Sequence, residues 1–384
     1  MSRKGWCLPA VLFGLLALLL CGCEAGPTGS QGERTDWESL SFDRPLELEY
    51  ATQFSAASSQ EGYTKLSIQD GEIYLLVPQG REVPQGTPSE ITVIHQPLEH
   101  IYLAATSAMD LFRELGAIDR VTLSALKSDG WYIPEAREAM DTGEMTYAGK
   151  YNAPDYEQIL SQGCDLAVES TMIYHNPEVK EQLEGFDIPV LVERSSYESH
   201  PLGRIEWIKL YGMLLGLEDQ AEVYFSGQLE QIQGILQQEN TGKTVAFFYI
   251  TSNGAANIRK SGDYVAKAID LAGGTYVFQN LTEEGSALST MNMDLETFYA
   301  GAKDADVLIY NSAIDGELHT LDQLLEKSHL LADFKAVKEG KVWCTGKNLF
   351  QESLGLGDFI VDLHTVLTQE RPPAESLTYL HPLQ

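Results

Sequence analysis

The longest stretch of helical periodicity covers residues 201–238, where apolar side chains recur every three or four positions. Pro201 suits the first turn of a helix, and a polar run ends the pattern before Gly242. On each side, short apolar runs alternate with amphipathic segments. The pattern predicts two α/β blocks joined by one long helix. A cleft between two such blocks is a favoured place for a ligand.

The block before the long helix alternates β-type runs with helical ones. Strands are expected at residues 91–94, 101–104, 121–126, 165–169 and 189–192, with a short one near Tyr147, and helices at 108–115, 154–160 and 177–183. Strands that alternate with helices predict a mostly parallel sheet with right-handed crossovers. We assign residues 91–200 to an N-terminal lobe of this kind.

The block after the long helix repeats the pattern. Residues 244–250 are almost all apolar, as in a buried parallel strand. Further strands are expected at 307–310 and 341–344, and helices at 264–272, 294–301, 320–337 and 357–367. We assign residues 239–370 to a C-terminal lobe and expect residues 371–384 to form a loosely attached tail.

A small β element precedes the first lobe, within residues 46–90. Two β-type runs, 65–68 and 72–77, flank Asp70-Gly71, which is a strong hairpin turn signal. The hairpin either covers a sheet edge or adds a contact surface. The sequence leaves both interpretations open.

The N-terminus has the features of an export signal. A basic start precedes an apolar run, 8–20, that is shorter than a membrane span. Residues 20–23, Leu-Cys-Gly-Cys, look like a bacterial lipobox, in which Cys23 would carry the lipid. The expected parts are a signal peptide, 1–22, and a tether, 23–45. Ordinary secretion with cleavage elsewhere is the alternative.

Charge and cysteines narrow the class of protein. The 384 residues include 26 basic and 56 acidic side chains, so the formal net charge is −30. Such a surface repels phosphate backbones, which argues against a nucleic-acid-binding protein. Beyond the leader and Cys23 there remain Cys164 and Cys344, and both a disulfide and two packed free thiols fit their positions.

Five stretches, in this order and spacing, together resemble one family. They are IYLAATSAMDLFRELGA, DYEQILSQGCDLAVES, RIEWIKLYGMLLGLEDQAEVYF, DLETFYAGAKDADVLIYNS and GKVWCTGKN. The chain resembles the helical-backbone class of bacterial ABC-transporter substrate-binding proteins, which are lipoproteins that capture ferric siderophores, haem or cobalamin. The resemblance covers residues 91–367. The additional β element before it departs from the family pattern.

The resemblance implies the fold and the function together. Two lobes joined by one long helix would hold a ferric siderophore between them and deliver it to a membrane permease and its ATPase. Haem or a corrinoid such as cobalamin is the alternative cargo. The protein would be a monomer without a cofactor, anchored by lipid to the outer face of the bacterial cell membrane.

A ligand is expected outside the carboxyl ends of the strands, on the side that faces the other lobe. The candidates from the first block are Thr106, Ser107, Lys127, Trp131, Tyr132, Tyr151, Thr171, Tyr174, Arg194 and Tyr197, and those from the second are Ser252, Asn253, Arg259, Asn311 and Asn348. Aromatic faces and cations suit a planar or chelated ligand with negative charge.

Several of these candidates have simpler structural roles open to them. Trp131 could cap an exposed loop, and the hydroxyls of Tyr174 and Tyr197 could anchor loops. His175 and His200 are either metal or haem ligands or ordinary surface histidines, and no paired spacing supports a metal site.

Two glutamates hold equivalent places in the two blocks. Glu157 and Glu296 each begin a helix that precedes an aspartate and a strand. The resemblance implies that each meets an arginine of a permease subunit. Acidic residues near helix N-termini are also favoured by the helix dipole, and that is the alternative.

Other classes of protein fit less well. The sequence has no Gly-x-Ser-x-Gly elbow, phosphate loop or His-Glu-x-x-His motif, so we assign no catalytic residue. An exported hydrolase would turn over its substrate, whereas a binding protein returns its ligand unchanged. An adhesin would have no pocket between the two lobes.

Overall fold

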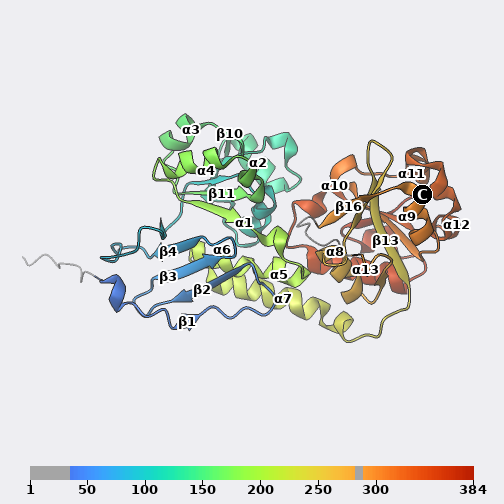
Figure 1. Ribbon diagram of the computed structural model, residues 1–384, viewed down its shortest axis with the longest axis horizontal. Helices are drawn as coiled ribbons and strands as arrows, with labels where there is room; N and C mark the ends of the chain where they lie inside the picture. Colours follow the sequence, from blue (N-terminus) through green and yellow to red (C-terminus); the bar gives the residue numbers. More distant parts are fainter. Residues whose placement is uncertain (1–34, 282–288) are drawn as a thin grey trace, which may run out of the picture. The chain divides into compact units, whose positions relative to one another are not determined.

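The computed structural model describes residues 35–281 and 289–384 (Figure 1). The expected signal peptide, the lipidation site Cys23 and the first part of the tether lie outside the described residues. Within the described part of the chain, no helix has both the length and the apolar character that a membrane span requires.

The first layer is a five-stranded sheet, in the order β1 (Arg44–Pro45), β2 (Phe54–Ser58), β3 (Thr64–Ile68), β4 (Ile73–Val77) and β5 (Thr92–His95). The predicted hairpin is confirmed as β3 and β4, and Gly71 adopts the positive φ of 102° that its turn requires. The first four strands are antiparallel, and β5 runs parallel to β4.

Two expectations about this region are wrong. The strand predicted at residues 91–94 as the first of the N-terminal lobe is instead β5 of this layer. It pairs with the edge of the buried strand β4 that β3 leaves free. The tether also ends earlier than expected, since the rings of Trp37 and Phe42 pack 5.5 Å apart and β1 pairs with β2. Residues 35–95 therefore form an ordered layer.

The N-terminal lobe has the predicted parallel sheet, in the order β12 (Val190–Glu193), β11 (Leu166–Ser170), β6 (Ile101–Leu103), β7 (Val121–Ser124) and β8 (Thr146–Tyr147). Around it lie the predicted helices α1 (Met109–Glu114), α3 (Tyr156–Ser161) and α4 (Pro177–Glu184), together with α2 (Pro134–Thr142), which the sequence pattern missed. Asp155 caps α3 and Pro177 begins α4.

The linking region is helical, but it is not one helix from 201 to 238. It divides into α5 (Pro201–Glu206), α6 (Ile208–Leu215) and α7 (Glu218–Leu236). Gly216 ends α6 in the left-handed conformation, with φ 69°, so the helix cannot continue into α7. The long helix is therefore confined to the 19 residues of α7.

The linking helices contact both lobes. Tyr211 of α6 packs its ring 5.3 Å from that of Phe112 in α1. The guanidinium of Arg204 in α5 lies 3.6 Å from the ring of Tyr264 in α8 (Tyr264–Leu271), which belongs to the C-terminal lobe. Residues 201–217 thus join the lobes, as the sequence predicted.

The C-terminal lobe has a parallel centre, β13 (Thr244–Ile250), β17 (Val307–Tyr310) and β18 (Val342–Thr345), with β15 (Thr275–Tyr276) parallel to β13. The predicted strands and helices are confirmed, the latter as α8, α9 (Leu295–Ala302), α11 (Leu321–Lys327), α12 (Lys335–Glu339) and α13 (Leu356–Thr368). The pattern missed the antiparallel strands β14 (Ala256–Arg259), β16 (Thr290–Met293) and β19 (Leu380–Pro382), and the short α10 (Ser312–Asp315).

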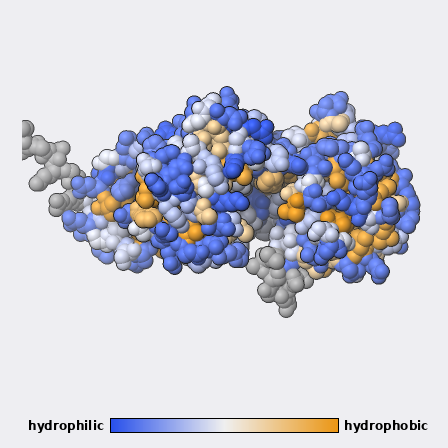
Figure 2. Space-filling view, turned by 90° about the horizontal axis from the view of Figure 1, so that it is seen from above, coloured by the Kyte–Doolittle hydropathy of each residue, from blue (hydrophilic) through white to orange (hydrophobic). Residues whose placement is uncertain are grey.

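The tail is not loosely attached. β19 pairs with β18, and the buried carboxylate of Asp362 in α13 accepts the N–H groups of Thr378, Tyr379 and Leu380. These bonds hold residues 378–380 against the lobe. One core cluster runs through the N-terminal layer, the linking helices and both lobes, while the face seen in Figure 2 is mostly hydrophilic with scattered apolar residues.

Candidate functional site

A cavity of about 630 Å³ is lined by both lobes and by α5. Its lining residues are Ser107, Ser195, Ser196, Tyr197, Glu198, Ser199, Arg204, Arg259, Lys260, Ser261, Gly262, Asp263, Tyr264, Leu281, Ser289, Leu349, Phe350, Ser353 and Leu356. The volume suits a ligand of several hundred daltons. We define the residues before α5 as its N wall and those after α7 as its C wall.

The C wall places positive charge beside an aromatic ring. Arg259 at the end of β14 pairs with Asp263, the cap of α8, at 3.4 Å. Burial lowers the pKa of Arg259, but Asp263 and the nearby tyrosines more than offset this and raise it, so the guanidinium stays charged. Arg259 lies 5.8 Å and Arg204 3.6 Å from the ring of Tyr264, which therefore has two cations near it.

The N wall is rich in hydroxyl groups. Ser195 and Tyr197 belong to the single turn η6 (Ser195–Tyr197) that follows β12, and Ser107 lies in the turn η2 (Thr106–Ala108) after β6. Arg204 fixes the first of these turns, because its Nη2 donates to the carbonyl of Ser196 at 2.6 Å. The ring of Tyr197 is 45% exposed, so this side chain is available to a ligand.

Two buried carboxylates attach the N wall and the adjoining α5 to the N-terminal layer. Glu198 accepts the N–H groups of Thr52 and Gln53 and the indole N–H of Trp207 at 2.8–3.0 Å. Glu206 of α5 accepts the N–H groups of residues 49–51 at 2.8–3.1 Å. Residues 49–53 are thus held by charge-assisted bonds from each end of the 198–206 segment.

The structure brings three of the sequence candidates to the cavity, namely Ser107, Tyr197 and Arg259. Thr106 adjoins Ser107 but does not line the cavity, and the backbone N–H of Tyr132 donates to Gln351 near its C wall, where the rings of Tyr132 and Phe350 lie 5.8 Å apart. Asn348 is bound to Glu352 through its amide at 2.9 Å.

The remaining candidates lie elsewhere. Trp131 is fully buried in the main core cluster and therefore does not cap an exposed loop. Asn311 is 5% exposed and caps α10. Lys127 lies over the ring of Tyr147, Tyr151 packs against a smaller core cluster within the N-terminal lobe, and Thr171 begins a turn after β11. Ser252 and Asn253 lie in an exposed loop after β13.

Tyr174 and Arg194 do not line the cavity, although the guanidinium of Arg194 lies 4.3 Å from the ring of Tyr197, which does. The Tyr174 hydroxyl donates to Asp70 at 2.6 Å and accepts from Arg194 Nη1 at 3.1 Å. His200 caps α5 by accepting the N–H of Leu202 at 3.2 Å, and His175 is an exposed residue. Neither histidine lines the cavity.

The sequence pattern missed most of the C wall. Residues 260–263 lie between β14 and α8, and Tyr264 is the first residue of α8, so none of them follows a predicted strand, since β14 was not predicted. Their signal was present as Arg259, Lys260 and Tyr264 gathered in an otherwise acidic chain. Phe350 was missed because the candidates after the last predicted strand extend only to Asn348, whereas Phe350 lies two residues further on, at the end of the turn η8 (Lys347–Phe350).

Glu157 and Glu296 occupy matching positions, and capping is performed by their neighbours. Asp155 accepts the N–H of Gln158 at 3.1 Å, and Asp294 accepts that of Thr297 at 2.8 Å. Each glutamate follows its cap by two residues and is exposed. Their side chains are thus available to a partner.

Both free cysteines are thiols. Cys164 is half-buried just before β11 in the N-terminal lobe and Cys344 is buried in β18, so they lie in different lobes. Burial raises the pKa of Cys164 to about 11 and that of Cys344 to about 12, which keeps both protonated at neutral pH.

Comparison with known proteins identifies the family. The sequence model described as periplasmic binding protein matches residues 84–349, which is most of the chain. An uncharacterized lipoprotein, MJ0878 of Methanocaldococcus jannaschii, is 25% identical over 319 residues, covering 78% of this chain and 73% of that protein.

Solved structures share the fold. The periplasmic haem-binding protein HutB of Vibrio cholerae aligns with a TM-score of 0.58 at 18% identity, over 71% of this chain and all of that one. A protein of an Fe³⁺-hydroxamate transport system from Saccharomonospora viridis gives 0.53 at 19%, covering 71% and 94%. The vitamin B12-binding protein BtuF of Vibrio cholerae gives 0.50 at 16%, covering 71% and 97%.

Proposed function

Since the chain belongs to the periplasmic binding protein family, we propose that it captures a ferric siderophore in the cavity between its lobes and delivers it to the permease of an ABC importer. Proteins of this family bind solutes and are not enzymes. The cargo and its route rest on the chemistry of the cavity and on the two exposed glutamates.

The observation that carries the proposal is the set of cations in the cavity. In a chain of net charge −30, Arg204, Arg259 and Lys260 all line one cavity. Cations there favour a ligand with negative charge, and arginine binds carboxylates and similar planar oxygen groups through two N–H donors. Ferric chelates of carboxylates, hydroxamates or catecholates present such oxygens at their surface.

Haem or a corrinoid remains the second candidate cargo, because solved relatives include a haem-binding and a vitamin B12-binding protein. Tyr197, Tyr264 and Phe350 offer aromatic faces to a macrocycle. Among the described lining residues there is no histidine, methionine or cysteine, so an axial iron ligand would have to be Tyr197 or Tyr264. This composition favours a complex that arrives with its metal already enclosed.

The proposal includes both ends of the delivery route, the permease contacts and the membrane anchor. We place the permease contacts at Glu157 and Glu296, where matching exposed charges on the two lobes suit a transporter with two similar subunits. We place the membrane anchor at Cys23. A relative described as a lipoprotein supports such an anchor, and fatty-acid labelling that disappears in Cys23→Ala would test it.

A thermal-shift and fluorescence titration tests the cargo directly. The purified protein is titrated with a ferric hydroxamate, a ferric catecholate, a ferric carboxylate chelate, haem and cobalamin. A ferric siderophore should raise the melting temperature and quench tyrosine fluorescence, since a ligand that binds the folded state stabilises it. A shift with haem or cobalamin and none with any ferric chelate would replace the proposed cargo with the second candidate.

A further inference from the structure

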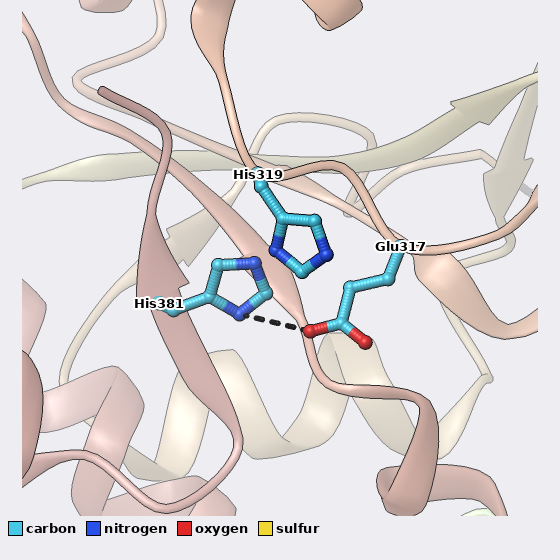
Figure 3. Close-up of side chains that lie close together, drawn as sticks. All are labelled: Glu317, His319 and His381. Atoms are coloured by element: carbon cyan, nitrogen blue, oxygen red, sulfur yellow. Dashed lines mark ion pairs between the residues drawn. The ribbon is translucent and has the colours of Figure 1, made fainter.

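A group of three metal-ligating side chains lies in the C-terminal lobe, outside the cavity. Glu317 and His319 belong to the loop between α10 and α11, and His381 belongs to β19 (Figure 3). One potential ligand atom from each lies within 4.8 Å of the others. Within residues 35–281 and 289–384, this is the one group of three histidine, cysteine or carboxylate side chains with such spacing.

The orientation of the His381 ring is fixed by a hydrogen bond to the backbone carbonyl group of Leu318. Its Nε2 lies 2.8 Å from the carbonyl oxygen of Leu318, so that nitrogen carries the proton and donates it. The lone pair then belongs to Nδ1, which faces Oε1 of Glu317 at 3.6 Å. A histidine whose second nitrogen donates to a backbone carbonyl has the arrangement typical of a metal ligand.

The distances suit a small divalent ion. Zn²⁺ with bonds of about 2.0–2.1 Å in tetrahedral geometry separates its ligands by about 3.4 Å. The contact between His381 and Glu317 is already near that value. The ring of His319 stacks on that of His381 at 5.5 Å and is exposed, so a small rotation can bring its nitrogen closer.

The loop that carries two of the three groups is itself held in place. The N–H of Leu318 donates to Sγ of Cys344 at 3.4 Å, and the N–H groups of His319 and Thr320 donate to Oε1 of Gln323. The other group is held by the pairing of β19 with β18. The ligands are therefore positioned by two separate elements before any ion arrives.

We propose that Glu317, His319 and His381 bind a divalent transition-metal ion, with Zn²⁺ the preferred ion and water completing its coordination. Two imidazoles and one carboxylate are ligands that Zn²⁺ prefers over Mg²⁺ or Ca²⁺. The ion would tie the C-terminal strand to the loop after β17. It is distinct from the cargo, because none of the three side chains lines the cavity.

Isothermal titration of the chelator-treated full chain with Zn²⁺ alone tests the site. We expect one equivalent to bind and the melting temperature to rise, and Co²⁺ to give the intense visible bands of tetrahedral coordination. His319→Ala should weaken Zn²⁺ binding at least tenfold. Its imidazole is exposed and forms no hydrogen bond with the residues that the structure describes, so the variant should fold and melt like the metal-free parent.

The matched control is His329→Ala, which removes another exposed histidine from the same lobe. It should bind Zn²⁺ as the parent does. Glu317→Gln, which keeps the shape of the side chain, should also weaken binding. If Zn²⁺ binds the parent and His319→Ala equally, or does not bind at micromolar concentrations, Glu317 and His381 form an ion pair only and the proposal is overturned. Cargo binding should be unchanged in His319→Ala whatever the cargo is.

Discussion

The two walls of the cavity differ in chemistry and in support. The C wall carries charge and aromatic surface, through Arg259, Tyr264 and Phe350, and is built from β14, α8 and the turn η8 of one lobe. The N wall offers mainly hydroxyl groups and is bonded through Glu198 and Glu206 to the layer formed by residues 35–95.

This difference suggests that the two lobes contribute different interactions to ligand binding, which we call the division of work between the walls. Cations on the C wall supply attraction for a charged ligand, while hydroxyls on the N wall can accept or donate as the ligand requires. The N-terminal layer gives the N wall a rigidity that its own short turn, η6, would lack. What the lobes share is an exposed glutamate two residues after an aspartate cap.

The largest effect, a loss of transport, is expected from substitution of the exposed glutamate that each lobe carries. Glu157→Lys or Glu296→Lys should each reduce transport to about a tenth or less, because reversal of one charge leaves one permease contact repulsive. Ligand affinity should be unchanged. Uptake measured with the cognate permease, beside a binding titration, checks both.

Matched controls for these variants exist in each lobe. Glu135→Lys in α2 and Asp322→Lys in α11 also reverse an exposed acidic residue in the first turn of a helix. Both should leave transport near that of the parent. Equal loss of transport in variants and controls would mean that general surface charge, rather than two specific contacts, governs delivery.

The hydrogen bonds that hold α5 and the N wall against the N-terminal layer can be weakened by a substitution at Glu206. Glu206→Gln replaces a charged acceptor of several backbone N–H groups and sets its amide N–H against them, so the free energy of unfolding should fall by about 2–4 kcal/mol. Urea denaturation measures the change. Glu218→Gln, at an exposed position of α7, should cost no more than about 0.5 kcal/mol.

The proposed difference between the walls can be tested by comparing the ligand affinities of one variant from each wall. Arg259→Gln should weaken binding of the ferric chelate about tenfold, because a charge-assisted contact is lost. Ser107→Ala removes a neutral hydroxyl from the N wall and should weaken it no more than about threefold. Comparable losses in the two variants, measured by fluorescence titration, would contradict the division of work between the walls.

The last effect concerns a buried carboxylate that accepts no hydrogen bond from the described residues. Glu169 in β11 is fully buried, neither of its oxygens has a hydrogen-bond partner among the described residues, and burial raises its pKa to about 8. Its folded pKa lies above the ordinary value of 4.5, so the folded state keeps the proton longer. The stability contributed by this group should therefore be lost as pH rises from about 4.5 to 8.

Glu169→Gln removes that titration. The variant should be more stable than the parent at pH 8, where the parent loses stability by ionising the buried group, and similar to it near pH 4.5, as measured by urea denaturation at each pH. This sign is opposite to that expected for Glu206→Gln. A loss of stability in Glu169→Gln at pH 8 would indicate that the carboxylate is ionised and has partners in solution.

Much of the fold could be predicted from local pattern. The apolar runs at 101–104, 165–169 and 244–250 are strands, and the hairpin about Gly71 and the helix after Asp155 form where their turn and cap residues indicate. Strands such as β14 and β19 were missed because their residues are mixed in polarity. Pairing with β13 and β18 stabilises them, and pairing partners are not visible in a single segment.

The candidate site was harder to predict. Residues after strands include true cavity residues such as Ser107 and Tyr197, but the same rule also selected Trp131, whose ring is in the core. Tyr174 and Arg194 follow strands too, yet Tyr174 donates to Asp70 and accepts a hydrogen bond from Arg194. Whether a side chain after a strand faces the other lobe depends on the turn that carries it.

The sequence by itself determined the α/β architecture with two lobes, the acidic surface and the resemblance to the family, because hydrophobic periodicity and charge are properties of each segment. The tertiary structure decided where the linking helix breaks, which layer takes up β5 and which residues face the cavity. Those outcomes depend on contacts between segments far apart in the chain, such as Glu206 with residues 49–51 and Arg204 with Tyr264. No local pattern contains the free energy of such contacts.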